Sequence, residues 1–409
     1  MSQYDLLIVG GGVGGSALAT VMARAGLKVL VLEASEVFED RVRGEWIAPW
    51  GVKEVQILEL YDLLIAAGGH HVASHVTYDE GRPAEVSEAE PTPLGIFATG
   101  ISGPLCLGHP HHCQTLIEAA VAQGATVIRG AQVLNVVGGS SPSVVWRDDA
   151  GEHTAAGRLL IGADGRASFV RESLGIRLHQ DPPHHMFAGL LVDDVKDWNA
   201  ERQTIGTEGR FNFLTFPQGG GRVRVYGCFP IEERRRFSGP SGPQTFLDAF
   251  RTACAPDHVR VAQGKPAGPL LSYFNNDAWT DEPYADGAVL VGDAGGWNDP
   301  IIGQGLSITY RDVRIVSDIL KLGDWSYAAF AAYGQERSER MRRLRFAASL
   351  TSSLDAEFGP EPAARRKRHH AAAAADMSLR AHALAVMAGP ESLPPEVLTP
   401  QYRAMVLGA

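Results

Sequence analysis

Three glycines near the N-terminus have the spacing of a phosphate-binding turn. Gly10, Gly12 and Gly15 are in Gly-x-Gly-x-x-Gly register, and Glu33 ends the next apolar run. The first glycine permits a tight turn, the second lets backbone approach a pyrophosphate, and the third lets a helix pack closely on a strand. A carboxylate at Glu33 can accept hydrogen bonds from ribose hydroxyls and disfavours a 2′-phosphate. These residues predict dinucleotide binding, with NAD and FAD both open.

The flanking sequence supplies the elements that such a turn needs. Residues 4–9 form an apolar run that predicts a buried strand, residues 16–25 have a helical pattern, and residues 28–32 predict a second strand. The N-terminus of the helix would present unpaired N–H groups and a partial positive charge to a phosphate. Glycine-rich turns also occur without ligands, but strand, turn, helix, strand and terminal acid in register favour the binding site.

Two later apolar runs also end in glycine and aspartate. Residues 158–163 lead into Asp164, and residues 288–291 open onto Asp293, which is followed by Asp-Pro-Ile-Ile-Gly-Gln-Gly-Leu at 299–306. In α/β sheets, ligand contacts gather where parallel strands end. We therefore expect these two strand ends to join the first motif in one site.

Together the three segments resemble those of the class A flavoprotein monooxygenases of the para-hydroxybenzoate hydroxylase type. The resemblance selects FAD: it implies that the first motif takes the ADP half and that Asp164 supports the cofactor. It also implies that Asp293 contacts the ribityl hydroxyls and that the backbone of residues 303–306 lies near the pyrimidine edge of the flavin. A second complete glycine motif is absent, which predicts that NAD(P)H visits a transient surface site.

The resemblance also singles out a basic loop and two departures from the family pattern. Arg41 and Arg43 fit a loop near the flavin, where an arginine pairs with cofactor phosphate; a solvated charged turn is the alternative, chiefly for Arg41. His109 stands where the family usually has Arg or Gln facing the flavin, and Ser307 replaces an asparagine. Since the flavin carries the chemical step, no catalytic side chain is assigned, and Arg43 and His109 are the candidates.

The expected cofactor contacts come from all of these segments and from one neighbouring strand. They are Gly10, Gly12, Val13, Gly14, Gly15, Glu33, Ala34, Arg41, Arg43, His109, Val133, Asp164, Asp293, Pro300, Gly303, Gln304, Gly305 and Leu306.

The predicted fold class is α/β: a Rossmann-like FAD-binding domain of the GR2 type, an inserted antiparallel β-sheet substrate domain, and C-terminal helices. The FAD-binding domain is expected to be discontinuous, over residues 1–70, 100–175 and 275–345. Alternating apolar segments place the substrate domain at 71–99 and 176–274, and a helical segment covers 346–409.

One sheet of the substrate domain should face the flavin across a cavity. The aromatic candidates for substrate contact are Trp46, Trp50, Phe211, Phe213 and Tyr226. Strand register decides which of them face the cavity, and the sequence does not determine it. Most aromatic residues in such strands belong to the core.

Composition limits the possible partners. A formal net charge of −10 disfavours binding to nucleic acid, and no apolar stretch reaches the roughly 18 to 20 residues of a membrane helix. Four cysteines without CxxC spacing suggest reduced thiols, and the N-terminus does not resemble a signal peptide, so we expect a cytoplasmic monomer or homodimer.

Two further features are expected to have no ligand. The histidine pairs that begin at 70, 184 and 369 show no acidic ligands that would complete a metal site, and the basic run at 365–370 is expected to be a solvated helix face.

The predicted function is FAD-dependent monooxygenation of an aromatic or polyketide-like small molecule, by hydroxylation or epoxidation. NAD(P)H would reduce FAD, and O2 would add to give a C(4a)-hydroperoxide that transfers its distal oxygen. An FAD-dependent reductase of the geranylgeranyl reductase type, a halogenase and a non-catalytic FAD-binding protein are the alternatives. A halogenase normally has a Trp-x-Trp-x-Ile-Pro signature, which is absent.

Overall fold

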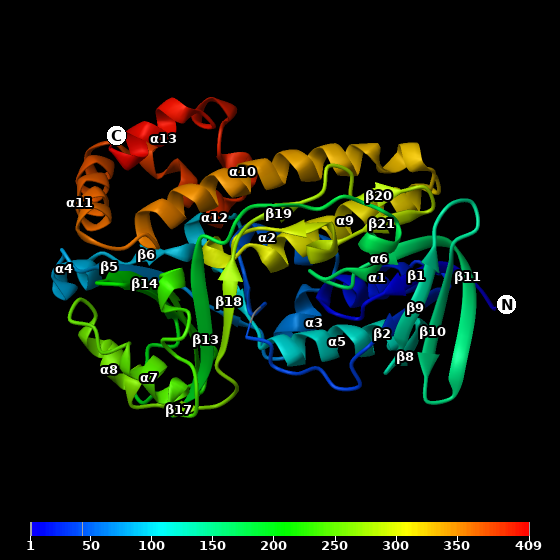
Figure 1. Cartoon of the computed structure of the whole chain (residues 1–409), viewed down its shortest axis with the longest axis horizontal. Coiled ribbons are helices and arrows are strands. Elements are labelled where there is room, and N and C mark those ends of the chain that lie inside the picture. The colour runs from blue at the N-terminus through cyan, green and yellow to red at the C-terminus, as the bar shows by residue number, and fades with distance from the viewer. Residues whose placement is uncertain (1, 43, 409) are drawn as a thin grey trace.

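A computed structural model describes residues 2–42 and 44–408. The first sheet is mainly parallel and has the strand order β20-β21-β11-β1-β2-β8 (Figure 1). The hairpin β9–β10 extends it by pairing with β11. Its strands are β1 (Ser2–Val9), β2 (Val29–Glu33), β8 (Thr126–Arg129), β9 (Gln132–Val137), β10 (Ser143–Asp148), β11 (Gly151–Gly162), β20 (Tyr284–Ala285) and β21 (Ala288–Leu290).

Alternate residues of β1 enter two different cores. Leu6 and Ile8 pack beneath α1 (Val13–Arg24), α5 (His109–Ala122) and α9 (Gly305–Leu322). Leu7 and Val9 pack on the other face, beneath the β9–β10 extension. Because strands β1, β2, β11 and β21 run parallel, their carboxyl ends lie along one edge, and the turns that follow them are neighbours.

A second sheet has the order β17-β13-β16-β15-β14-β5-β6, with β18 also paired to β13. It is antiparallel, as predicted, except where β14 and β5 run parallel. One face packs against α7 (Gly242–Asp248) and α8 (Val259–Ala262). Its strands are β5 (Ser74–Asp79), β6 (Thr92–Pro93), β13 (His185–Asp193), β14 (Arg202–Glu208), β15 (Phe211–Pro217), β16 (Val223–Phe229), β17 (Lys265–Pro266) and β18 (Leu271–Asn275).

The predicted C-terminal helices are present. They are α10 (Ala331–Asp355), α11 (Pro360–Ala375), α12 (Ala381–Ala388) and α13 (Pro400–Leu407). In Figure 1 the long α10 runs along both sheets, and the three shorter helices gather at its C-terminal end beside the second sheet.

Short elements connect these layers. They are β3 (Trp46–Ile47), α2 (Pro49–Ile57), α3 (Tyr61–Ala66), β4 (His70–His71), α4 (Ala84–Ala89), β7 (Leu105–Cys106), α6 (Phe169–Ser173), β12 (His179–Gln180), β19 (Ala278–Trp279) and β22 (Gly296–Trp297). Among the helices of the described ranges, none combines the length and the apolar character needed to cross a bilayer.

Candidate functional site

The three predicted strand ends meet at one cavity of about 1780 Å³. Gly12, Asp164 and Asp293, which come from the three separate motifs, all line it. The same cavity continues past the second sheet to the C-terminal helices. Pockets for single small molecules usually measure about 300–1,000 Å³, so this space is large enough for more than one ligand.

The first glycine turn is shaped by close backbone packing. Gly10 has φ +101°, and a Cβ there would lie 2.4 Å from the carbonyl oxygen of Ala163. A Cβ on Gly15 would lie 1.9 Å from the carbonyl oxygen of Gly10. By contrast, a Cβ on Gly12 would meet no atom within 4 Å, and Gly12 caps α1 without a side-chain hydrogen bond. The open space and the uncapped amides at this helix N-terminus fit a pyrophosphate.

Glu33 is fixed beside this turn. Its carboxylate is 9% exposed and accepts hydrogen bonds from the backbone N–H of Gly11 (2.7 Å) and of Ser35 (2.8 Å). Both Glu33 and the following Ala34 line the cavity. The two amide contacts hold the carboxylate at the position where the sequence predicts a ribose contact.

The other two aspartates differ in what they contact. Asp164 accepts hydrogen bonds from the hydroxyl of Ser168 (2.5 Å) and the N–H of Val170 (3.0 Å), and burial raises its pKa. It therefore shapes the turn before α6. Asp293 forms an ion pair with Arg166 (3.2 Å), and its side chain is 32% exposed, so its carboxylate remains accessible from the cavity.

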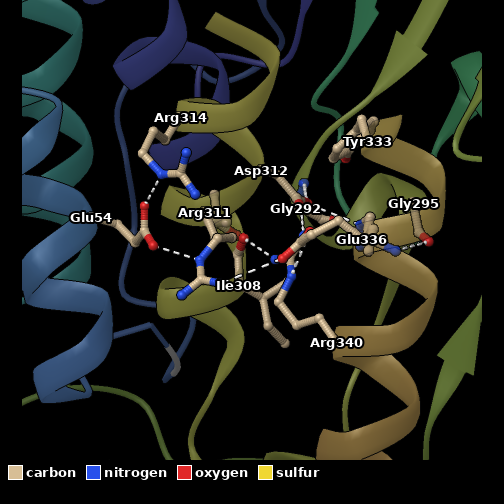
Figure 2. A network of polar contacts seen from close by, with 12 residues as sticks. Glu54, Gly292, Gly295, Ile308, Arg311, Asp312, Arg314, Tyr333, Glu336 and Arg340 are labelled. Carbon is tan, nitrogen blue, oxygen red and sulfur yellow. Dashed lines mark hydrogen bonds and ion pairs between the residues drawn. The ribbon is translucent and has the colours of Figure 1, made fainter. Parts of the chain in front are cut away.

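A buried polar network holds the turn that carries Asp293 from behind (Figure 2). Asp312 of α9 accepts the N–H of Gly292 (2.9 Å) and pairs with Arg340 of α10 (2.7 Å). Arg337 also pairs with Asp312 and donates to the carbonyl oxygens of Gly292, Gly295 and Gly296 at 2.7–3.0 Å.

The three charged side chains are at most 2% exposed. Burial alone would lower the pKa of Arg337, but Asp312 raises it above its ordinary value. The backbone of this turn is therefore set by the protein itself.

The loop before α9 lines the cavity. Pro300, Gly303, Gly305 and Leu306 line the cavity together with Gln304, whose side-chain amide is held by hydrogen bonds within the protein. That amide accepts a hydrogen bond from the indole of Trp50 and donates one to the carbonyl of Val386.

Ser307, which replaces the family asparagine, is fully buried and lies outside the cavity. Its hydroxyl accepts the N–H of Ala48 (3.1 Å), which attaches α9 to the start of α2.

The basic loop at residues 41–45 borders the cavity and is anchored to the second sheet. Arg41 lines the cavity, whereas Arg43 lies outside the described residues. Arg224 of β16 is 1% exposed and donates to the carboxylates of Glu45 and, at 2.7 Å, Asp40. Burial acts to lower the pKa of Arg224, and Glu45 raises it above its ordinary value. The loop is thus held by a buried ion-pair cluster.

His109 lines the cavity as the first residue of α5. Its Nδ1 would lie 2.7 Å from a Cβ on Gly44. The imidazole therefore packs against the basic loop. Val133 of β9 also lines the cavity, whereas Gly15, buried beneath the turn, does not.

Strand register corrects two of the substrate-contact predictions. On β15, Leu214 and Phe216 line the cavity, whereas Phe211 and Phe213 point to the opposite face. There Phe211 packs edge-on against Phe250, at a centroid separation of 5.5 Å, and Phe213 packs against the same ring in a tilted arrangement, at 6.4 Å. The prediction for Phe211 and Phe213 is wrong because alternate residues of a strand face opposite sides.

The remaining aromatic predictions divide in the same way. Trp46 lines the cavity, and its indole donates to Gln203 (2.9 Å); Tyr226 also lines it, close to Phe187 (5.0 Å). Trp50 does not line the cavity, because its ring is buried beneath the loop before α9.

Several residues that line the cavity were not predicted from the sequence. Arg224 was recognisable in principle, since a lone arginine inside the apolar run Val-Arg-Val-Tyr-Gly-Cys-Phe is unusual. The aromatic and polar residues of the sheet face needed the register; these are Phe187, Gln203, Phe216, Tyr273 and Asn275.

The predictions for the histidine pairs and for the basic run at 365–370 also need correction. The potential ligand atoms of Asp181, His184 and Asp277 lie within 4.8 Å of one another, so acidic side chains do converge on one of the histidine pairs. In the basic run, Arg366 is 2% exposed and pairs with Asp79 (2.7 Å) and Glu80, so this part of the helix face is not solvated.

Comparisons with known proteins agree with this geometry. The profile of the FAD binding domain matches residues 3–347. Squalene epoxidase 2 of Arabidopsis thaliana is 24% identical over 337 residues, which cover 78% of this chain and 54% of that protein. The chain thus spans about half the length of the squalene epoxidases it matches.

Two other relatives match over most of their length. The 6-methylpretetramide 4-monooxygenase of Streptomyces rimosus is 25% identical over 373 residues, which cover 84% of this chain and 83% of that enzyme. The crystal structure of p-nitrophenol 4-monooxygenase from Pseudomonas putida superposes with a TM-score of 0.78 at 16% identity, covering 96% of this chain and 99% of the other, which shows a shared fold.

Proposed function

The chain belongs to the family that shares this FAD binding domain, the class A flavoprotein monooxygenases, and from that premise we propose that it is an FAD-dependent monooxygenase. It would use NAD(P)H and O2 to hydroxylate or epoxidise an aromatic or polyketide-like molecule. The observation that carries the proposal is the single cavity, which joins the glycine cradle to an aromatic sheet face. The relative named for a pretetramide substrate supports the substrate class.

The residues present fit FAD. The amides of residues 12–14 would hold the pyrophosphate, Glu33 the ribose, Asp293 the ribityl chain, and the backbone of residues 303–306 the pyrimidine edge. When bound, FAD supplies the redox chemistry that activates oxygen, which side chains alone do not provide.

The chain itself would position the reactants and exclude water. The α9 N-terminus directs a partial positive charge toward the loop at residues 303–306, which favours negative charge there. Trp46, Phe216 and Tyr226 line the cavity with aromatic rings, which would exclude water from the face of a bound substrate. Arg41 would meet cofactor phosphate or the incoming nicotinamide, and His109 would stand beside the flavin.

We also propose a cytoplasmic location and a monomer or homodimer. The four cysteines are all free and buried, which is compatible with a reducing compartment.

Substitution of Gly12 tests the cofactor site. The space above Gly12 is empty, so Gly12→Asp should fold, with a melting temperature of the apoprotein close to that of the wild type. The added carboxylate would face the pyrophosphate, and we expect FAD affinity to fall about 100-fold through like-charge repulsion. Gly12→Ala is the matched neutral control and should lose less. Unchanged FAD affinity in Gly12→Asp would refute the assigned position of the cofactor.

Isotope labelling tests the reaction. With 18O2, NADPH or NADH and a panel of phenols and polyketide aromatics, the product should carry one labelled oxygen atom. A reduced product formed without oxygen uptake would instead identify a reductase, and failure to oxidise either nicotinamide would favour a non-catalytic role.

A further inference from the structure

The cavity extends well beyond the part of the chain that defines the family. The FAD binding domain profile ends at residue 347, yet the distal wall of the cavity comes from the segment after it. Lining residues there include Leu354, His382, Ala383, Leu384, Val386 and Met387.

This C-terminal segment is fastened to the body on two sides. The buried pair of Arg366 with Asp79 joins α11 to β5, and the side-chain amide of Gln304 donates to the carbonyl of Val386 in α12 (3.2 Å). Gln304 belongs to the loop that would lie beside the flavin. The segment is therefore a built wall of the cavity, and it contacts the proposed cofactor loop directly.

The wall opposite is the end of the second sheet. His75 and Thr77 of β5 face the cavity, and Gln203 of β14 lies between His75 and Trp46. Burial lowers the pKa of both His75 and His382 to about 4, so both imidazoles are neutral at pH 7. Both histidines thus offer neutral hydrogen-bonding groups to the space between β5 and α12, which we call the distal chamber.

The charged groups of this chamber are either buried carboxyls or exposed cations. Asp79 is neutralised by Arg366, and burial raises the pKa of the Asp355 carboxyl to about 6. Lys367 and Arg380 line the cavity with exposed side chains, so they belong to its solvent-facing rim. An anionic headgroup would find no buried, unpaired cation among these groups.

We propose that residues 348–409 form the distal half of the substrate site, which holds the non-reacting part of an elongated, non-anionic polycyclic substrate with hydroxyl or carbonyl groups. The reacting ring would lie against Trp46 and Tyr226, and the remaining rings would extend between β5 and α12. This inference rests on the proposed monooxygenase function, and it adds that substrate length is recognised by the C-terminal segment.

Titration of the FAD-loaded full chain with two probes tests the inference. The probes are a hydroxylated naphthoquinone, with two rings, and a hydroxylated naphthacenequinone, with four; perturbation of flavin absorbance reports binding without turnover. Two additional rings add about eight heavy atoms, and at about 0.3 kcal/mol per atom we expect the longer probe to bind at least tenfold more tightly.

Bulk added to the distal wall should remove this preference. Ala383 lines the cavity with an exposed side chain, so Ala383→Trp should fold and should weaken the four-ring probe about tenfold, while the two-ring probe changes by less than about twofold. Ser378→Trp, also exposed and lining, is a second variant with the same expected result. Ala374→Trp, exposed on α11 but outside the cavity lining, is the matched control.

Three results would overturn the inference: no preference for the longer probe, equal weakening of both probes, or no effect of either lining variant. These outcomes are separable from failure of the proposed function. Loss of FAD binding, or absence of 18O from the product, would reject the monooxygenase. Normal FAD binding and oxygenation without a length preference would reject only the role of the C-terminal segment.

Discussion

The two ends of the cavity are built in different ways. At the dinucleotide end the surface is mostly backbone, set by glycines such as Gly10 and by carbonyls and amides that buried charges hold in place. At the substrate end the surface is made of side chains, such as Phe216 and Tyr226, on alternate positions of strands. A backbone surface admits few residue types, whereas a side-chain surface admits many. The first end is therefore constrained in sequence, and the second is constrained mainly in register.

The largest effect that would test this contrast is expected from Arg337. Arg337→Met would remove the hydrogen-bond donors to three carbonyl oxygens of the turn at 292–296. It would also leave the fully buried carboxylate of Asp312 with one neighbouring positive charge fewer. Breaking such a pair should lower the free energy of unfolding by about 5 kcal/mol. In the folded fraction, we expect weaker FAD binding and an altered flavin absorbance spectrum.

Arg342→Met is the control on the same helix. Arg342 is 48% exposed and pairs with Glu339, so its loss should cost less than about 1 kcal/mol and leave FAD binding unchanged. Equal FAD affinity in Arg337→Met and the wild type, measured at a temperature where both are folded, would show that the turn does not depend on the network.

A pair of phenylalanines on β15 tests the substrate end. Phe213 is fully buried among aromatic rings, so Phe213→Ala should lower the free energy of unfolding by about 4 kcal/mol, measured by urea denaturation. Phe216 is only half-buried and lines the cavity, so Phe216→Ala should cost less stability but weaken binding of an aromatic substrate. The reverse pattern would mean that the assigned faces of the sheet are exchanged.

The same contrast explains what the sequence could predict. The three FAD segments and the two-sheet fold were predictable because glycine and aspartate at strand ends leave little freedom. The positions of Phe211, Phe213 and Trp50 were not, since one step of register or one local turn decides whether an aromatic side chain meets a ligand or the core. The convergence of Asp181, His184 and Asp277 depends on loops far apart in the sequence, which local patterns do not place.

The smallest expected effect concerns Asp299, in the loop that joins the two ends. Its carboxylate is 1% exposed; Oδ1 accepts the N–H of Ile301, while Oδ2 has no hydrogen bond with any described residue. Burial raises its pKa from 3.8 to about 6. The folded state therefore retains a proton that the unfolded state loses between these values, and this group lowers stability as pH rises from about 4 to about 6.

Asp299→Asn should remove that loss. Relative to the wild type, the free energy of unfolding of the variant should rise little at pH 4 and by at most about 3 kcal/mol at pH 7. Thermal unfolding of both proteins at a fixed FAD concentration measures this difference. Asp286→Asn, at an exposed position, is the control and should show no such pH-dependent gain. A gain that is the same at both pH values would contradict the buried, protonated state.

The alternation along β16 also constrains how this protein could accept new ligands. Arg224 and Tyr226 meet the cavity, whereas Val223 and Val225 meet the core beneath α7. A single-residue insertion or deletion in the strand would exchange these faces, because it would turn the Arg224 guanidinium away from Glu45 and Asp40 into the apolar core and turn core valines toward the cavity. Ligand specificity in this sheet can therefore change only by substitution of the alternate residues that face the cavity. Changes in the length of a loop or helix can alter the cavity only where helices form its wall, as in the C-terminal segment.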